Sequence, residues 1–139
     1  MALPTKIALE IVTPEGLLLR EDVDELVAPG ASGYFGVRPG HTPLMAALGL
    51  GEISYRRAES WRRLTCFSGW CEVLPDRVNI LADIGERAED IDVDRAEEAL
   101  RRAEERLKRI KDEEGYTDAH VAYVRAVTRL AVARRQHGQ

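Results

Sequence analysis

The sequence predicts an all-β sandwich domain over residues 1–88, followed by an antiparallel α-helical hairpin over residues 89–139. Two observations lead to this division. The first 88 residues contain short apolar or alternating segments separated by frequent turn signals, with no helical period between them. Beyond residue 88, apolar residues recur every three or four positions, which is the period of an amphipathic helix. We therefore expect a stiff β domain joined to a small helical unit.

The expected strands are short, and each is bounded by a turn. Residues 6–12 are rich in β-branched and aliphatic side chains, and Thr13-Pro14-Glu15-Gly16 turns the chain into a hairpin with residues 17–20. Ile53 and Tyr55 alternate with polar neighbours, as in a half-buried strand. Further strands are expected over residues 23–28, 44–48, 52–56, 61–67, 70–74 and 77–82.

The segment from Gly33 to Gly40 contains four glycines or prolines, which is too many for an uninterrupted strand. Its composition favours a compact surface loop that makes two tight turns around residues 34–37. His41 follows this segment and has no carboxylate or serine at a spacing that suggests catalysis. A hydrogen-bonded loop histidine is therefore favoured over a catalytic base.

Two helices are expected after residue 88. Asp90-Ile91-Asp92 offers an N-cap for the first, and Asp112-Glu113-Glu114-Gly115 is expected to end it with a glycine C-cap. Thr117 or Asp118 is expected to cap the second helix. The seam residues of the first helix are Val93, Ala96, Leu100, Ala103, Leu107 and Ile110, and those of the second are Ala119, Ala122, Ala126, Leu130 and Ala133.

The outer face of the first helix offers four i,i+4 ion pairs, Glu97/Arg101, Glu98/Arg102, Glu104/Lys108 and Glu105/Arg109. Valines at positions 121, 124, 127 and 132 lie largely away from the seam of the second helix, which implies a second surface on the sandwich or on another protein. A two-helix hairpin has little core of its own. We therefore expect it to detach from the sandwich and redock.

Four arginines project from single sides of the two helices. Arg95 and Arg102 are seven residues apart on the first, and Arg125 and Arg129 are four apart on the second. In an antiparallel hairpin these guanidinium groups can converge on a phosphate chain. The alternative is that they belong to an ordinary solvated surface with ion pairs.

Composition excludes several classes of function. Twenty Lys and Arg against 24 Asp and Glu give a net charge of −4, which argues against nucleic acid as the main partner. The sequence shows no membrane-spanning run and no signal peptide. Cys66 and Cys71 do not have the spacing of a redox pair or a zinc site, so we expect reduced thiols in a cytosolic-side protein. No catalytic residue and no metal site is predicted.

Five segments share the order and spacing of a known family. They are Gly33-Tyr34-Phe35-Gly36-Val37-Arg38-Pro39-Gly40-His41-Thr42-Pro43-Leu44, Gly51-Glu52-Ile53, Ser68-Gly69-Trp70-Cys71-Glu72-Val73, Val78-Asn79-Ile80-Leu81-Ala82-Asp83 and Glu86-Arg87-Ala88-Glu89-Asp90-Ile91-Asp92. With the alanine-rich hairpin after them, they resemble the epsilon subunit of the bacterial F-type ATP synthase along nearly the whole chain.

The resemblance implies a non-catalytic rotor subunit of a proton-translocating ATP synthase. Family members sit in the central stalk and couple the gamma subunit to the membrane ring of c subunits during ATP synthesis. The implied partners are gamma, the c-ring and the alpha/beta catalytic head, and the implied location is peripheral, on the cytoplasmic face of the cell membrane. By position, Ser32, Gly33 and Tyr34 are expected to meet the c-ring, and His41, Thr42 and Ala46 to meet gamma. Many members carry an acidic residue where this chain has Tyr34.

In the family the hairpin lies folded against the sandwich or extends along gamma into the catalytic head, where it inhibits ATP hydrolysis. The basic residues that would then face the beta subunit are Arg125, Arg129, Arg134 and Arg135. Such a change requires a hairpin that can detach from the sandwich, as the sequence predicts.

Some members bind ATP on the folded hairpin through an Ile/Leu-Asp-x-x-Arg-Ala motif. It is intact here as Ile91-Asp92-Val93-Asp94-Arg95-Ala96, although capping by Asp92 and packing of Ala96 would also explain it. No cofactor is required, and ATP would be a regulatory ligand. The implied ATP contacts are Glu86, Ile91, Asp92, Arg95, Ala96, Arg102, Arg125 and Arg129.

Two other classes of function stay open at this point. One is a free-standing ATP-sensing binding protein, with the hairpin as the clamp. The other is a small β-sandwich hydrolase that uses His41. A stable complex with gamma, a monomer that responds to ATP, and catalytic turnover would distinguish the three.

Overall fold

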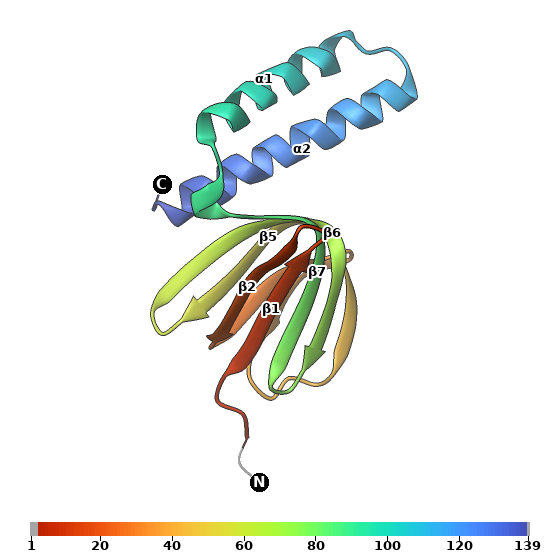
Figure 1. Ribbon diagram of the computed structural model, residues 1–139. Coiled ribbons are helices and arrows are strands. Elements are labelled where there is room, and N and C mark those ends of the chain that lie inside the picture. Colours follow the sequence, from red (N-terminus) through yellow and green to blue (C-terminus); the bar gives the residue numbers. More distant parts are fainter. Residues whose placement is uncertain (1–2, 139) are drawn as a thin grey trace.

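The computed structural model describes residues 3–138 and shows seven strands followed by two antiparallel helices (Figure 1). This confirms the predicted fold class. The predicted limits at residues 1 and 139 lie outside the described residues, and the division of the chain into two domains stays a prediction. The elements are β1 (Ile7–Thr13), β2 (Gly16–Val23), β3 (Glu25–Gly30), β4 (Gly33–Val37), β5 (Leu44–Arg57), β6 (Ser60–Leu74), β7 (Arg77–Arg87), the 3-10 helix η1 (Ala88–Asp90), α1 (Val93–Arg109) and α2 (Glu113–Gln136).

The strands form one sheet in the order β2-β1-β7-β6-β5-β3-β4, which folds into a sandwich. β1 pairs in parallel with β7, whereas the other neighbouring strands pair antiparallel. Buried aliphatic side chains from both layers fill the interior, and this core cluster contains residues of the strands but none from η1, α1 or α2 among those described. The sandwich therefore has an interior of its own, separate from the helices.

Long strands replace several of the short ones that the sequence predicted. Gly49-Leu50-Gly51 separates the strands predicted over residues 44–48 and 52–56, and Ser68-Gly69 separates those predicted over 61–67 and 70–74, but β5 and β6 run through these positions. The two strands stay in register on either side, with Leu48 opposite Gly69 and Leu50 opposite Phe67. This continuous pairing carries both strands through the glycines, which were wrongly interpreted as strand ends.

The alternation of inward-facing and outward-facing residues along β6 shifts by one residue at Ser68-Gly69. Leu64 and Cys66 point into the core before this step, and Cys71 and Val73 do so after it. Ser68 and Gly69 have φ angles of 70° and 146°, so two left-handed residues absorb the change. Phe67 alternates with the inward-facing Cys66, so it lies outside the core cluster although it is buried.

The segment at residues 33–37 forms the edge strand β4, so its interpretation as a loop was wrong. β4 pairs antiparallel with β3, from Leu26 opposite Val37 to Gly30 opposite Gly33. An edge strand has one neighbour and tolerates glycines that a central strand would not. Phe35 also packs against the core and helps to hold the segment to the sheet.

The second helix begins four or five residues before its predicted caps. Asp112 is the N-cap, and its carboxylate accepts a hydrogen bond from the Gly115 amide at 2.7 Å. A side chain at Gly115 would collide with that carboxylate, so the glycine makes room for the cap and does not end α1. α1 ends at Arg109 instead, and Thr117 lies inside α2.

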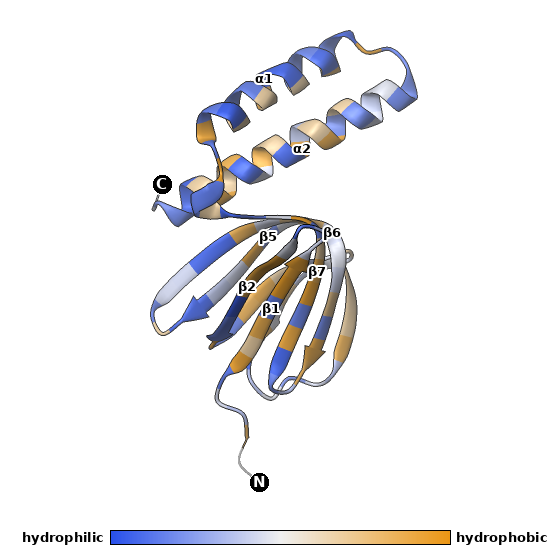
Figure 2. Cartoon of the chain, viewed as in Figure 1, coloured by the Kyte–Doolittle hydropathy of each residue, from blue (hydrophilic) through white to orange (hydrophobic). Residues whose placement is uncertain are grey.

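The hairpin is held by the small seam that the sequence predicted. Ala96 and Ala103 of α1 and Ala119 and Ala126 of α2 are buried, whereas α1 is otherwise largely hydrophilic (Figure 2). Of the four predicted i,i+4 pairs, the structure shows Glu98–Arg102 and Glu105–Arg109. Glu97 instead binds Arg134 across the hairpin at 3.2 Å.

Both cysteines are free and buried in the sandwich. Burial raises the pKa of the Cys66 thiol from 9.0 to about 12, and that of the Cys71 thiol to the same value. They are therefore protonated and unreactive at neutral pH, as expected for structural thiols.

Candidate functional site

One stripe of α2 faces the sandwich. Arg125, Arg129, Val132 and Gln136 follow one another at spacings of four, three and four residues, which places them on one side of a helix. We call these residues the docking stripe. α2 lies between α1 and the sandwich and contacts β5 and β6 near the C-terminal end of the helix, and Arg129 of the stripe also binds Glu86 of β7 (Figure 1). Of the predicted surplus valines, Val132 is buried on this stripe and Val127 is exposed.

Phe67 of β6 is the aromatic contact of this interface. The guanidinium carbons of Arg125 and Arg129 lie 5.6 and 5.1 Å from the centre of its ring, within the range of cation–π attraction. Phe67 as a residue is 1% exposed. Arg125 Nε is buried and has no hydrogen-bond partner within the described residues. The hairpin thus covers an aromatic ring with two cations rather than with an apolar helix face.

Glu86, near the end of β7, holds Arg129 from the sandwich side. Arg129 Nε donates a hydrogen bond of 2.8 Å to Glu86 Oε1. The buried Thr65 hydroxyl donates to the same oxygen at 3.0 Å and accepts from the Glu86 backbone amide at 3.0 Å. Thr65 therefore positions the carboxylate that the hairpin binds.

A cavity of about 420 Å³ lies where the two helices meet the end of β7. It holds seven of the eight predicted ATP contacts, and the eighth, Arg125, lies over Phe67 instead of in its lining. The lining residues are Glu86, Asp90, Ile91, Asp92, Arg95, Ala96, Ala99, Arg102 and Arg129. Sequence reasoning missed Asp90, which directly precedes the motif, and Ala99, which lies three residues after Ala96 on α1.

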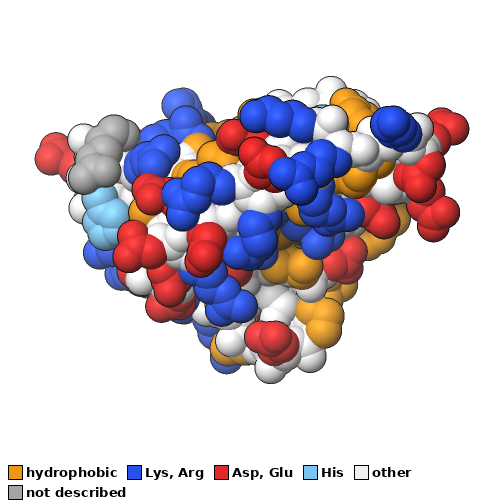
Figure 3. All heavy atoms as spheres, turned by 90° about the horizontal axis from the view of Figure 1, so that it is seen from above, with side chains coloured by type: hydrophobic (Ala, Val, Ile, Leu, Met, Phe, Trp, Pro, Cys, Tyr) orange, Lys and Arg blue, Asp and Glu red, His pale blue; other side chains and the backbone are white. Residues whose placement is uncertain are grey.

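The charges of this cavity suit a phosphate-bearing molecule. Three arginines from both helices line it, and Arg102 is 64% exposed with a long contact of 3.9 Å to Glu98. Asp92 is already engaged, since its carboxylate caps α1 by accepting from the Arg95 amide at 3.1 Å. Seen from the hairpin side, arginine and lysine side chains gather along the helices between acidic ones (Figure 3). The arrangement can bind an anion, and its volume falls in the range of small-molecule sites.

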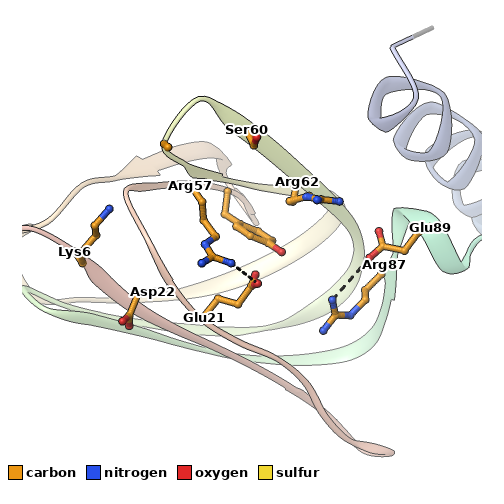
Figure 4. A pocket seen from close by; sticks show the side chains of 10 residues that line it. Lys6, Glu21, Asp22, Arg57, Ser60, Arg62, Arg87 and Glu89 are labelled. Carbon is orange, nitrogen blue, oxygen red and sulfur yellow. Dashed lines mark hydrogen bonds and ion pairs between the residues drawn. The ribbon is translucent and has the colours of Figure 1, made fainter.

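A larger cavity of about 690 Å³ opens between β2 and the β5–β6 turn and contains none of the predicted site residues (Figure 4). Several of its charges are already paired: Arg57 binds Glu21 at 2.9 Å, and Arg87 lies 3.8 Å from Glu89 and donates to the Leu18 carbonyl at 2.6 Å. Burial and the adjacent Glu21 carboxylate raise the pKa of Tyr55 in its wall. We therefore take the smaller cavity as the candidate ligand site.

The residues predicted to meet the c-ring lie at the β3–β4 turn. Ser32 and Gly33 are exposed, and Tyr34 is 60% exposed. The Tyr34 hydroxyl accepts a hydrogen bond of 3.0 Å from the Glu52 amide, so the ring is fixed across β5 rather than free in solvent.

The residues predicted to meet gamma lie just beyond β4 and at the start of β5. His41 is half-buried, and its Nδ1 donates to the Thr42 carbonyl at 2.6 Å. Thr42 is exposed and Ala46 is half-buried in β5. The Ala31 amide donates to the Ala47 carbonyl at 2.8 Å, so the β3–β4 turn lies beside the Ala46 segment.

The four arginines predicted to meet the beta subunit all have contacts in the docked hairpin. Arg129 binds Glu86, Arg134 binds Glu97 and Arg135 binds Glu52 at 3.0 Å. Arg125 lies over Phe67. The contacts of Arg125, Arg129 and Arg135 join the hairpin to the sandwich, so these contacts break when the hairpin leaves, whereas Arg134–Glu97 lies within the hairpin.

An exposed apolar row crosses the outer face of the sheet, and sequence reasoning missed it. Leu17, Val12, Leu81, Trp70 and Ala47 are directly opposite one another on β2, β1, β7, β6 and β5. Side chains opposite one another share a face of the sheet. Leu17, Leu81 and Trp70 are each more than half exposed. Apolar side chains grouped in this way make a candidate interaction surface.

Comparison with known proteins gives the family. The model of the ATP synthase delta/epsilon chain β-sandwich domain matches residues 6–88, and that of the delta/epsilon chain long α-helix domain matches residues 89–134. The ATP synthase epsilon chain of Syntrophobacter fumaroxidans is 50% identical over 130 residues, covering 94% of this chain and 97% of that relative. The chain belongs to the ATP synthase epsilon-chain family. The epsilon chain of Nitratidesulfovibrio vulgaris is a second relative, 44% identical over 124 residues, with 89% of this chain and 92% of that one covered.

Solved structures share the fold of this epsilon-family chain. A chain of the Euglena gracilis mitochondrial ATP synthase (OSCP/F1/c-ring) superposes with a TM-score of 0.82 at 20% identity, covering 94% of this chain and 83% of that one. A chain of the Tetrahymena thermophila mitochondrial ATP synthase central stalk/c-ring gives 0.65 at 13% identity, with coverages of 95% and 99%. Over residues 3–138, none of the helices is long and apolar enough to span a membrane.

Proposed function

We propose that this epsilon-family chain is a rotor subunit of the central stalk, which couples gamma to the c-ring and regulates ATP hydrolysis through its hairpin. It has no catalytic role of its own in this proposal, and it associates peripherally with the cytoplasmic face of the cell membrane through the complex. The sandwich has a complete interior independent of the helices, which suits a stiff element that transmits torque. The family membership and the fold support this assignment.

Gamma is the partner that we assign to the exposed apolar row. The row lies on the outer face of β5, β6 and β7, where Trp70 and Leu81 offer a surface that a second protein can cover. His41, Thr42 and Ala46 extend this contact toward the start of β5. The c-ring is assigned to the β3–β4 turn with Ser32, Gly33 and Tyr34, which presents a fixed, exposed aromatic residue.

The observation that carries the regulatory part is the polar character of the docking contact. Arg129–Glu86, Arg135–Glu52 and two arginines over Phe67 connect the hairpin to the sandwich. These polar groups can exchange their partners for water or for other charged groups, which suits reversible docking. In the extended state, Arg125, Arg129, Arg134 and Arg135 exchange their partners for acidic residues of the beta subunit and block hydrolysis.

Removal of the hairpin tests this regulatory role. We expect a chain that ends at Asp90 to give severalfold faster ATP hydrolysis by the catalytic head than the full-length chain, because the inhibitory element is absent. The core cluster lies within the retained residues, so the shortened chain keeps its binding to gamma, which co-purification checks. Equal hydrolysis with both chains, at equal incorporation, would remove the inhibitory role.

We assign the cavity between the helices to ATP as a regulatory ligand. The phosphate chain is bound by Arg95, Arg102 and Arg129, which all line the cavity. A ligand that binds only the folded hairpin stabilises that state and so relieves inhibition.

Calorimetry with Arg95→Ala tests the ATP site. Loss of one charge-assisted contact to phosphate is expected to weaken ATP binding by about tenfold to a hundredfold. Arg101→Ala is the matched control, since Arg101 lies on the same helix outside the cavity lining and should leave the affinity unchanged. If the unaltered chain takes up no ATP at millimolar nucleotide, the ligand assignment is wrong.

A free-standing ATP-sensing protein is the second candidate, and the same cavity favours it. That candidate gives a monomer that responds to ATP and does not co-purify with gamma. A stable complex with gamma through the apolar row would exclude it.

A further inference from the structure

The last turn of α2 contacts a part of β6 that has no strand on one side. β7 ends at Arg87, opposite Leu64, so Ser60–Arg63 of β6 extend past its end. The Gln136 side chain fills this place. Its Oε1 accepts from the Arg63 amide at 2.7 Å, and its Nε2 donates to the Trp61 carbonyl at 3.1 Å. One primary amide thus satisfies both backbone groups that a neighbouring strand would otherwise bond.

Arg135, the preceding residue, binds a carboxylate that is held in place by the sandwich. Arg135 Nε donates to Glu52 Oε1 at 3.0 Å, and the Glu52 side chain is 14% exposed. Ser54 Oγ donates to Glu52 Oε2 at 3.1 Å, and Arg63 Nε lies 3.9 Å from Oε1. Glu52 is therefore positioned before the hairpin arrives. Its backbone amide also bonds the Tyr34 hydroxyl.

We propose that the free edge of β6 at Trp61 and Arg63 is a binding site for a primary amide, occupied within the chain by Gln136, and that with Glu52 it forms a latch for the hairpin. The amide has the donor and acceptor that this edge requires, which no charged or apolar side chain supplies together. Release of the last turn leaves Arg63 N–H and Trp61 C=O to water, so the latch is polar and reversible.

This inference rests on the proposed mobile hairpin, but its test measures docking and not inhibition. Amide hydrogen exchange is followed by NMR in the full-length chain and in Gln136→Ala. Loss of both hydrogen bonds is expected to raise the exchange rate of the Arg63 amide about tenfold. The amide of Leu64, which pairs with both β5 and β7, is the internal reference and stays unchanged.

The docked fraction is measured in the same chains from the distance between spin labels at Glu59→Cys and Glu105→Cys, since both native cysteines are buried. We expect the undocked fraction to rise about tenfold in Gln136→Ala. Arg134→Ala is the matched control, because Arg134 binds Glu97 within the hairpin and should leave both readouts unchanged.

The exchange rate of the Arg63 amide tests the amide site, and the docked fraction tests the latch. Unchanged Arg63 exchange in Gln136→Ala would overturn the amide site. Faster Arg63 exchange with an unchanged docked fraction would overturn the latch while keeping the contact. If the latch is present but hairpin removal has no effect on ATP hydrolysis, the proposed regulatory function fails and this inference stands.

Discussion

Gly69→Ala is expected to destabilise the sandwich by about 4 kcal/mol, which combines backbone strain with overpacking. Gly69 has a φ of +146°, a conformation that residues with a Cβ rarely adopt. A Cβ at this position would overlap the Leu81 carbonyl oxygen and lie 2.9 Å from the Ala82 Cα, and both belong to the backbone of the central strand β7. Neither β6 nor β7 can move without breaking its pairing with the other.

Urea or thermal unfolding of the full-length chain measures this effect, and the midpoint temperature should fall by roughly 15–30 °C. Gly16→Ala is the matched control. Gly16 has a φ of +126°, but a Cβ there meets no atom within 4 Å, so strain alone applies and the cost is about 1–2 kcal/mol. Similar losses in both variants would show that the close approach to Leu81 contributes nothing.

Phe67→Ala is expected to undock the hairpin and leave the sandwich nearly as stable as before. The ring lies outside the core cluster and is covered by Arg125 and Arg129. Without the Phe67 ring, the two guanidinium groups lose their aromatic contact and a space is left beneath α2. We expect docking to weaken by about 3 kcal/mol, which raises the undocked population about a hundredfold.

Amide exchange along α2 measures this change, because a released two-helix hairpin is marginally stable and its amides exchange faster. Phe67→Leu keeps an apolar side chain without the aromatic face. Its α2 exchange rates should therefore fall between those of the unaltered chain and those of Phe67→Ala, and their difference from the unaltered chain measures the cation–π contribution. If Phe67→Ala lowers the stability of the sandwich by several kcal/mol while α2 stays protected, the ring belongs to the sandwich interior and not to the docking contact.

The fold could be predicted from the sequence because its determining signals are local. Turn residues separated the strands, and the change to a period of three to four residues marked the hairpin. Local signals were misleading where a long-range partner decided the outcome. Gly115 resembles a helix end, yet the Asp112 carboxylate occupies the space that the glycine leaves. Ser68-Gly69 resembles a strand break, yet the pairing with β5 continues through it.

Part of the candidate site could also be predicted, because some of its residues are close together in the sequence. The Ile91–Ala96 motif is a contiguous segment, and four of its residues line one cavity with Arg102 and Arg129. The place of Arg125 over Phe67 and the contact of Gln136 with β6 join residues about 58 and 73 or more positions apart in the chain, and no local pattern encodes them. The apolar row depends on the parallel pairing of β1 with β7, which sequence spacing does not reveal.

The pairing of β1 with β7 also sets the order in which the protein can fold during synthesis. The first strand has no neighbour other than β2 until residues 77–87 have left the ribosome, because β7 is the last strand to be made. Contacts between such distant segments close slowly. The nascent chain therefore spends most of its translation with an incomplete sheet, and a chaperone that shields strand edges would act in this interval. The helices emerge last, when the surface that receives them can already exist.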